Sequence, residues 1–198
     1  MIIKIAALLS MLVLLISCAP LPKSLPVIET PPVRMHQTGY SILPLDEPGW
    51  EIGKRDQIEL VIGKRGNMDH TFVYRSLLVK LEPYTNPEKF VSVVKEWIDK
   101  DGDTTRFNAV KHETVFHSFQ SAVCARSHLL HEDKKALTSS SKPGNMIMEM
   151  RVLTCGHPKD KQVGVMVIYS ERYWPGDRDP KFDSRAEELM AGLLLENF

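Results

Sequence analysis

Seven histidines are the residues of this chain whose chemistry suits metal binding or proton transfer. His112 and His117 lie five residues apart, and His128 and His131 lie three apart. A zinc site needs three or four ligands converging at about 2.0–2.3 Å, and a helical site places two histidines four residues apart. In a strand, an odd spacing puts the two members of each pair on opposite faces. The pattern predicts scattered histidines, with no metal site and no cofactor.

Motifs for nucleophilic catalysis are missing from the sequence. There is no Gly-x-Ser-x-Gly turn, no phosphate-binding loop and no dinucleotide-binding fingerprint. A catalytic site would have to be assembled from His, Asp and Ser residues scattered along the chain. We therefore favour a non-enzymatic role, assign no catalytic residue, and keep a hydrolase as the alternative.

The segment Arg172-Tyr173-Trp174 is a candidate binding motif at the end of an apolar strand. Aromatic residues and arginine are enriched at binding surfaces. Exposed rings beside Arg172 would bind a peptide, a glycan or a partner protein. The alternative, which we favour, is that Tyr173 and Trp174 cover the end of the core.

The start of the chain has the composition of an export signal. Lys4 precedes a largely apolar run of 12 residues, from Ile5 to Ile16. A signal-peptide core is about 7–15 residues long, whereas a spanning helix needs about 20 apolar residues. Pro20 and Pro22 would stop a helix from continuing. The run therefore predicts a cleaved leader and not a membrane-spanning helix.

The tetrapeptide Leu15-Ile16-Ser17-Cys18 resembles the lipobox of bacterial lipoproteins. In that family the cysteine becomes the lipidated first residue of the mature protein. The resemblance implies a signal peptide over residues 1–17 and attachment to a membrane through acyl chains on Cys18. Ala19 lacks the acidic retention signal of inner-membrane lipoproteins in enteric bacteria. The resemblance therefore implies the outer membrane, facing the periplasm, in a host with two membranes.

The charge balance argues against nucleic acid as a partner. The whole chain has 25 basic and 25 acidic residues, and removal of Lys4 with the leader leaves 24 against 25. Nucleic-acid-binding domains usually carry a strong basic excess. We expect no nucleic-acid partner, and membrane attachment must come from acylation because the net charge cannot supply it.

Cys124 and Cys155 are the cysteines that remain once Cys18 is assigned to the lipobox. Disulfides form and persist in exported domains, so we expect the pair to be bonded. The two positions sum to 279, so a hairpin that pairs them also pairs Leu129 with Met150. The alternative is a reactive or metal-binding pair of thiols.

Proline marks the region between the leader and the domain. Seven of the 13 prolines fall between Ala19 and Pro48. Such a stretch favours extended polyproline geometry. We expect a lipidated cysteine and tether over residues 18–48, followed by a single domain over residues 49–198.

Hydrophobic periodicity and capping residues predict the elements of this domain. Asn86 and Pro87 mark the start of one helix, whose apolar stripe is Phe90, Val93, Val94, Trp97 and Ile98. Ser184 and Glu187 have the spacing of a capping box before a second stripe of Ala186, Leu189, Met190, Leu193 and Leu194. Extended segments are expected at residues 50–54, 57–63, 70–82, 105–109, 114–120, 122–130, 146–155 and 162–171, with a turn at 63–67.

These elements predict an α+β domain with a largely antiparallel β-sheet packed against two α-helices, preceded by the Pro-rich tether. The order of strands, helix, strands and C-terminal helix resembles the PsbP-like fold over about Trp50 to Phe198. A shared fold does not carry function.

Two functions remain open. The first is a membrane-anchored envelope lipoprotein that acts as a non-enzymatic binding or accessory subunit, with an envelope protein or complex as its partner. The second is a cell-envelope hydrolase with a site built from scattered His, Asp and Ser residues.

Overall fold

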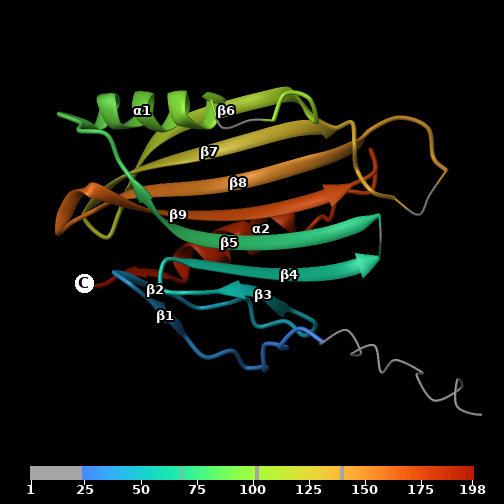
Figure 1. Cartoon of the computed structure of the whole chain (residues 1–198), viewed down its shortest axis with the longest axis horizontal. Helices are drawn as coiled ribbons and strands as arrows, with labels where there is room; N and C mark the ends of the chain where they lie inside the picture. Colours follow the sequence, from blue (N-terminus) through green and yellow to red (C-terminus); the bar gives the residue numbers. More distant parts are fainter. Residues whose placement is uncertain (1–23, 68, 101–102, 139–140) are drawn as a thin grey trace, which may run out of the picture.

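The computed structural model describes residues 24–67, 69–100, 103–138 and 141–198 (Figure 1). Within these ranges, seven antiparallel strands form the main sheet in the order β3-β4-β5-β9-β8-β7-β6. Their bounds are β3 Glu51–Arg55, β4 Glu59–Asn67, β5 His70–Lys80, β6 Phe107–Phe119, β7 Ala122–Asp133, β8 Met146–His157 and β9 Asp160–Tyr173. With two helices, this is the predicted α+β class. The predicted leader, Cys18 and residues 19–23 lie outside the described residues.

The helices lie on opposite faces of the main sheet. Helix α1 (Pro87–Lys100) covers β6 and β7, and helix α2 (Phe182–Ala191) lies behind β8 and β9 in the view of Figure 1. The central strand β9 is therefore apolar on both sides, as predicted. Val165 and Val167 belong to the core beneath α2, while Met166 belongs to the core beneath α1. Neither helix is long and apolar enough to span a membrane, as far as the described residues extend.

Strands β7 and β8 have the predicted register. Cys124 lies opposite Cys155, and Leu129 lies opposite Met150. The two sulfur atoms are 2.13 Å apart, at bonding distance, and both residues are fully buried in the core on the α2 side. Because the bond joins directly opposed residues of adjacent strands, it ties the start of β7 to the end of β8 on the α2 side of the sheet.

Helix α1 begins as the sequence predicts, with one error in its buried face. The side-chain oxygen of Asn86 accepts a hydrogen bond from the backbone N–H of Lys89 at 2.8 Å, which satisfies a free donor of the first turn. Phe90 and Val94 are fully buried, but Trp97 is 36% exposed. The prediction that Trp97 packs in the core is wrong, because it lies at the edge of the stripe and faces a surface cleft.

Helix α2 begins at Phe182, two residues before the predicted capping box. Ser184 lies in its first turn and donates a hydrogen bond to the carbonyl of Lys181 at 3.0 Å, so it does not cap the helix. The helix ends at Ala191 with Gly192 as its C-cap, and the apolar run continues as strand β10 (Leu193–Leu195). Leu193 is buried in that strand, whereas Leu194 is 40% exposed, because the side-chain period changes from helix to strand.

The predicted tether is wrong for most of its length. Strands β1 (Met35–Gln37) and β2 (Tyr40–Ile42) form a three-stranded antiparallel sheet with β10. Ile42 and Tyr40 are fully buried, and Ile28 is 6% exposed. Val27 also pairs with Glu51 at the edge of the main sheet. The packed domain therefore begins by residue 27, because apolar residues spaced among the prolines cover the core beneath α2.

Two strand predictions also need correction. The predicted turn at residues 63–67 is part of β4, which continues to Asn67 with an irregular register after Arg65. The two extended segments at 105–109 and 114–120 form one strand, β6, with a register shift between Ala109 and Lys111. In both places the strand absorbs an irregular residue and then continues.

Candidate binding site

A cleft beside helix α1 is the first candidate site. It has a volume of about 510 Å³ and lies between the helix and the segment that leads into it from β5. Trp97 and Val93 form the helix side, and Leu81 and Pro83 form the opposite side. This volume is within the range of about 300–1,000 Å³ typical of ligand sites. An indole that is 36% exposed here offers a large apolar contact surface.

The rim of this cleft is charged. Lys80 and Glu82 lie on the strand side, and Glu96 and Lys100 on the helix side. The ammonium group of Lys100 is 2.6 Å from the carboxylate of Glu96, and both side chains are well exposed. The cleft thus combines an apolar interior with a rim that carries positive and negative charges, an arrangement typical of protein-binding surfaces.

The predicted motif Arg172-Tyr173-Trp174 does not present aromatic rings to solvent. Tyr173 is 6% and Trp174 is 5% exposed. The Tyr173 hydroxyl donates a hydrogen bond to Glu149 at 2.8 Å, and the ammonium group of Lys142 lies 6.0 Å from the ring centre of Trp174. The favoured alternative, in which both rings cover the end of the core, is confirmed. Arg172 instead lines a groove on the other face of the sheet.

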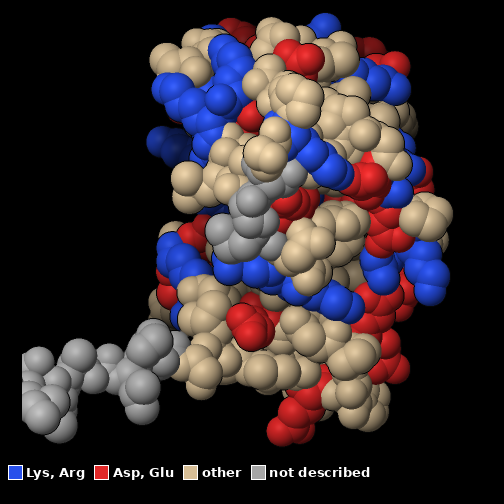
Figure 2. Space-filling model, turned by 90° about the vertical axis from the view of Figure 1, so that its right-hand side faces the viewer, with Lys and Arg blue, Asp and Glu red and all other residues tan. Residues whose placement is uncertain are grey.

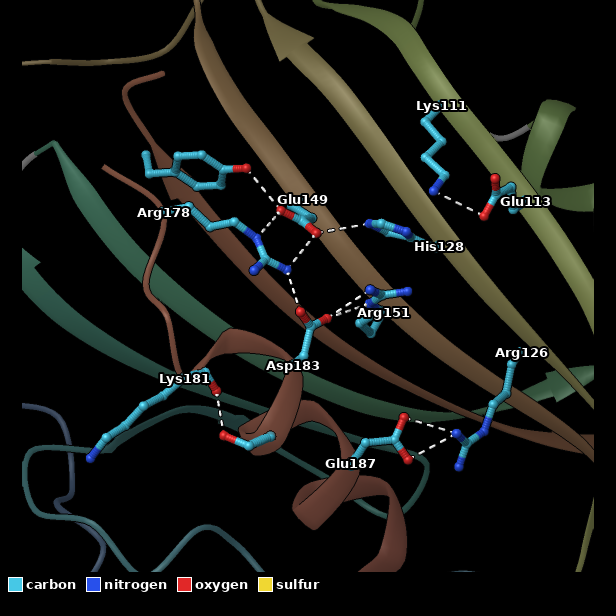
Figure 3. Close-up of polar contacts among 12 residues, drawn as sticks. Lys111, Glu113, Arg126, His128, Glu149, Arg151, Arg178, Lys181, Asp183 and Glu187 are labelled. Carbon is cyan, nitrogen blue, oxygen red and sulfur yellow. Dashed lines mark hydrogen bonds and ion pairs between the residues drawn. The ribbon is translucent and has the colours of Figure 1, made fainter. Parts of the chain in front are cut away.

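A buried ionic network between the sheet and α2 was not predicted from the sequence (Figure 3). At its centre is Glu149, whose side chain is 4% exposed. Arg178 donates two hydrogen bonds to the carboxylate, at 2.7 and 2.9 Å. Nε2 of His128 lies 2.8 Å from Oε1 of the same carboxylate, an oxygen that Arg178 also contacts. Burial alone would raise the pKa of Glu149, but the hydrogen bonds from Arg178, Tyr173 and His128 outweigh it and hold the pKa below its usual value.

The network continues onto helix α2 through Asp183. Arg178 donates to one of its carboxylate oxygens at 2.8 Å, and Arg151 donates to the other at 3.0 and 2.7 Å. Burial opposes ionisation of Asp183, but these two guanidinium groups lower its pKa. Further along the same helix, Arg126 donates to both oxygens of Glu187 at 2.8 Å. Every carboxylate of this row has an arginine partner, so the row fixes α2 on the sheet.

A second buried carboxylate, Glu171, has a different environment. It is fully buried, and one of its oxygens accepts a hydrogen bond from the backbone N–H of Asp179 at 2.7 Å and lies 2.6 Å from His70. Burial raises its pKa, which these hydrogen bonds reduce only in part. The neighbours of Glu171 therefore stabilise its negative charge less than Arg178 stabilises that of Glu149.

The structure gives each histidine its own surroundings. Across the described residues, no three His, Cys, Asp or Glu side chains gather as metal ligands do. His70, His112 and His128 each pair with a single carboxylate. Burial lowers the pKa of His128 and of His131, so both favour the neutral form.

One chain of hydroxyl and imidazole groups has the order of a catalytic relay. Nδ1 of His112 lies 2.5 Å from the carboxylate of Asp99, and its Nε2 lies 3.1 Å from the hydroxyl of Thr114. That hydroxyl is 2.9 Å from the hydroxyl of Ser127. Asp99 and Trp97 are two residues apart and therefore about 160° apart around α1. The relay thus lies on a different side of the helix from the cleft.

The overall architecture is PsbP-like. A solution structure of cyanobacterial PsbP (CyanoP) from Synechocystis sp. PCC 6803 superposes with a TM-score of 0.51 at 12% sequence identity, and the match covers 91% of this chain and 98% of that one. At this identity the similarity shows the fold alone. No protein-family model matches the chain, and no curated protein matches it in sequence.

Proposed function

We propose that the protein is a lipid-anchored protein of the bacterial envelope that serves as a non-enzymatic binding or accessory subunit of an envelope assembly. The observation that carries the binding role is the cleft beside α1, where Trp97 is 36% exposed within an apolar wall. Single exposed apolar residues are common on protein surfaces. A tryptophan that lines a cleft of about 510 Å³ is instead typical of a site where a partner buries a large apolar side chain.

The partner that suits this cleft is an apolar segment of another envelope protein. The apolar walls would bury its side chains, and the alternating charges of Lys80, Glu82 and Glu96 at the rim would pair with polar groups beside them. The location rests on Cys18 and its lipobox context. The Cys124–Cys155 bond supports it, since such bonds persist in oxidising compartments.

Two measurements test the proposal separately. Mass spectrometry of the protein from membranes should find an acylated Cys18 as the first residue. An unmodified Cys18, or cleavage elsewhere, would remove the anchor from the proposal.

The binding role is tested by affinity purification from detergent-solubilised envelope with Trp97→Ala and Val115→Ala as matched variants. Val115 is also exposed, at 59%, but lies on β6 away from the cleft. We expect Trp97→Ala to lose a partner that Val115→Ala retains. If both variants retain the same partners as the wild type, the cleft is not the binding site.

The hydrolase alternative is favoured by one observation, the Asp99–His112–Thr114 relay. A carboxylate that orients a histidine, and a histidine at hydrogen-bond distance from a hydroxyl, are the groups of a general base and its nucleophile. An activated hydroxyl would react with a fluorophosphonate probe. Labelling that is lost in Thr114→Ala and retained in Ser118→Ala, an exposed hydroxyl on the same strand, would support the enzyme, and absence of labelling would argue against it.

A further inference from the structure

A groove lies on the same face of the main sheet as α1, over the strands that this helix does not cover. It has a volume of about 730 Å³ and runs over β3, β4, β5, β9 and the start of β8, at the right-hand end of the sheet in Figure 1. Its floor includes Val61, Val73 and Met148. Gly53 and Gly63 also lie along it, and an added Cβ at either would meet nothing closer than 3.7 Å. The groove is therefore open and partly apolar.

Arginine dominates the charged residues of this groove. Arg65, Arg106 and Arg172 line it from three separate segments, together with Lys64, and Glu51 is the acidic residue among the lining residues. Arg106 also donates to both oxygens of Asp133 at 2.8 and 2.7 Å, which fixes its guanidinium at the groove. Figure 2 faces this end of the molecule and shows clusters of Lys and Arg side chains among acidic ones. Guanidinium groups bind phosphate through paired N–H donors.

The beginning of the described chain lies at the same groove. Leu25 is one of its lining residues and is 47% exposed. Val27 pairs with Glu51 of β3, which fixes the direction from which the chain enters the sheet. Cys18 precedes Ser24 by six residues, which reach at most about 20 Å when fully extended. Acyl chains on Cys18 would therefore bring a membrane surface close to these three arginines.

We propose that this groove binds the phosphate headgroups of anionic lipids and so fixes the domain with this end of the sheet toward the membrane. The orientation rests on the proposed acylation of Cys18, while the headgroup contact is made by Arg65, Arg106 and Arg172. The apolar floor, with Leu25 at its edge, accommodates the glycerol and upper acyl region beneath each phosphate. The cleft beside α1 shares no lining residue with the groove and lies at the opposite end of β5.

The test uses the full chain with vesicles of phosphatidylcholine alone, or of phosphatidylcholine and phosphatidylglycerol in equal parts. Phenylglyoxal modifies accessible arginines, and peptide mass spectrometry gives the rate at each position. A basic residue near an anionic surface contributes about a fivefold factor in binding. We therefore expect Arg65 and Arg172 to react at least about fivefold more slowly on the anionic vesicles. Arg55, exposed near the other end of β3, should react equally on both.

Two variants with the same change of charge provide the control. Arg172→Glu should remove the protection of Arg65, whereas Lys159→Glu, at the exposed β8–β9 turn, should leave it intact. If Arg172→Glu does not fold, Arg65→Glu is used with Arg172 as the reporter. Equal rates on the two kinds of vesicle would overturn the proposal. If inorganic phosphate protects Arg65 and Arg172 as well as anionic vesicles do, the site binds free phosphate, and the assignment to lipid headgroups is overturned.

The acylation of Cys18 is read separately from the mass of the amino-terminal peptide. An acylated chain binds both kinds of vesicle through its anchor, so the comparison isolates headgroup charge. If Cys18 is not acylated, protection on anionic vesicles still supports the headgroup contact and only the anchored orientation fails. Protection that persists at 1 M salt, where the Debye length is about 3 Å, would contradict an electrostatic contact.

Discussion

Replacement of Glu149 by glutamine should destabilise the fold far more than the same replacement at Glu187. Both carboxylates lie between the sheet and α2, and both accept two hydrogen bonds from one arginine. They differ in burial, because the side chain of Glu149 is 4% exposed and that of Glu187 is 60% exposed. The pair therefore compares one chemical change in two environments.

The magnitude follows from the contacts that Glu149→Gln removes. In either orientation the new amide NH2 would face a donor of Arg178, together with His128 or Tyr173, so about two hydrogen bonds are lost at roughly 1.5–3 kcal/mol each. A buried ion pair that loses one partner typically costs about 3–5 kcal/mol. We therefore expect a loss of about 3–5 kcal/mol for Glu149→Gln and about 0–1 kcal/mol for Glu187→Gln.

Urea unfolding at neutral pH measures both variants, and in thermal unfolding each kcal/mol should lower Tm by roughly 2–4 °C. The pH dependence adds a second check. The pKa of Glu149 is lowered in the folded protein, so its stabilisation is present above the unfolded pKa of 4.5 and is lost as the pH falls through the lower folded pKa. The difference between Glu149→Gln and the wild type should shrink over that range. Equal losses for the two variants at neutral pH would refute the account of the network.

Three further predictions concern the core and its boundaries. In urea unfolding, Trp97→Ala should lower stability by under about 1 kcal/mol because its ring is partly exposed. Phe90→Ala, fully buried on the same helix, should lower it by about 3–5 kcal/mol. A loss for Trp97→Ala as large as that for Phe90→Ala would mean that the Trp97 ring is buried. Thiol titration of the denatured, unreduced protein should find no free thiol from Cys124 or Cys155, and replacing both with alanine should remove at most about 3.7 kcal/mol, given their separation of 31 residues; two free thiols would contradict the bond. Ile42→Ala should lower the free energy of unfolding by about 2–5 kcal/mol because Ile42 is fully buried. No measurable loss would instead support the predicted tether over residues 18–48.

The parts of the fold that the sequence predicts are those set by local pattern. Asn86 and Pro87 determine where α1 begins, and the positions of Cys124 and Cys155 define the register of their hairpin. The region of residues 27–48 was misjudged for a physical reason. Its prolines favour an extended backbone, but short strands also have an extended backbone. Only tertiary contacts distinguish a solvent-exposed tether from strands that pack on the core.

The candidate sites were harder to predict because they join distant segments. The hairpin register brings His128 close to Glu149, so that contact could have been inferred from the positions of the cysteines. Arg178 comes from a loop after β9, and no periodicity indicates that it turns back onto Glu149. Burial of Tyr173 and Trp174 likewise depends on that loop. The cleft was missed because Trp97 shares the spacing of the buried stripe and differs only in lying at its edge.

The small sheet of β1, β2 and β10 brings the two ends of the domain together. Tyr40 lies opposite Leu195, so residues more than 150 positions apart are neighbours in one ladder. A chain that emerges amino-terminus first, from a ribosome or through a translocation pore, can pair β2 with β1 early, but β10, its partner on the other side, comes much later. The edge of β2 stays unpaired until residue 195 has emerged, and such an edge is a site for pairing with other chains. Strand β10 therefore completes the small sheet late, and the interval before then is when aggregation competes with folding.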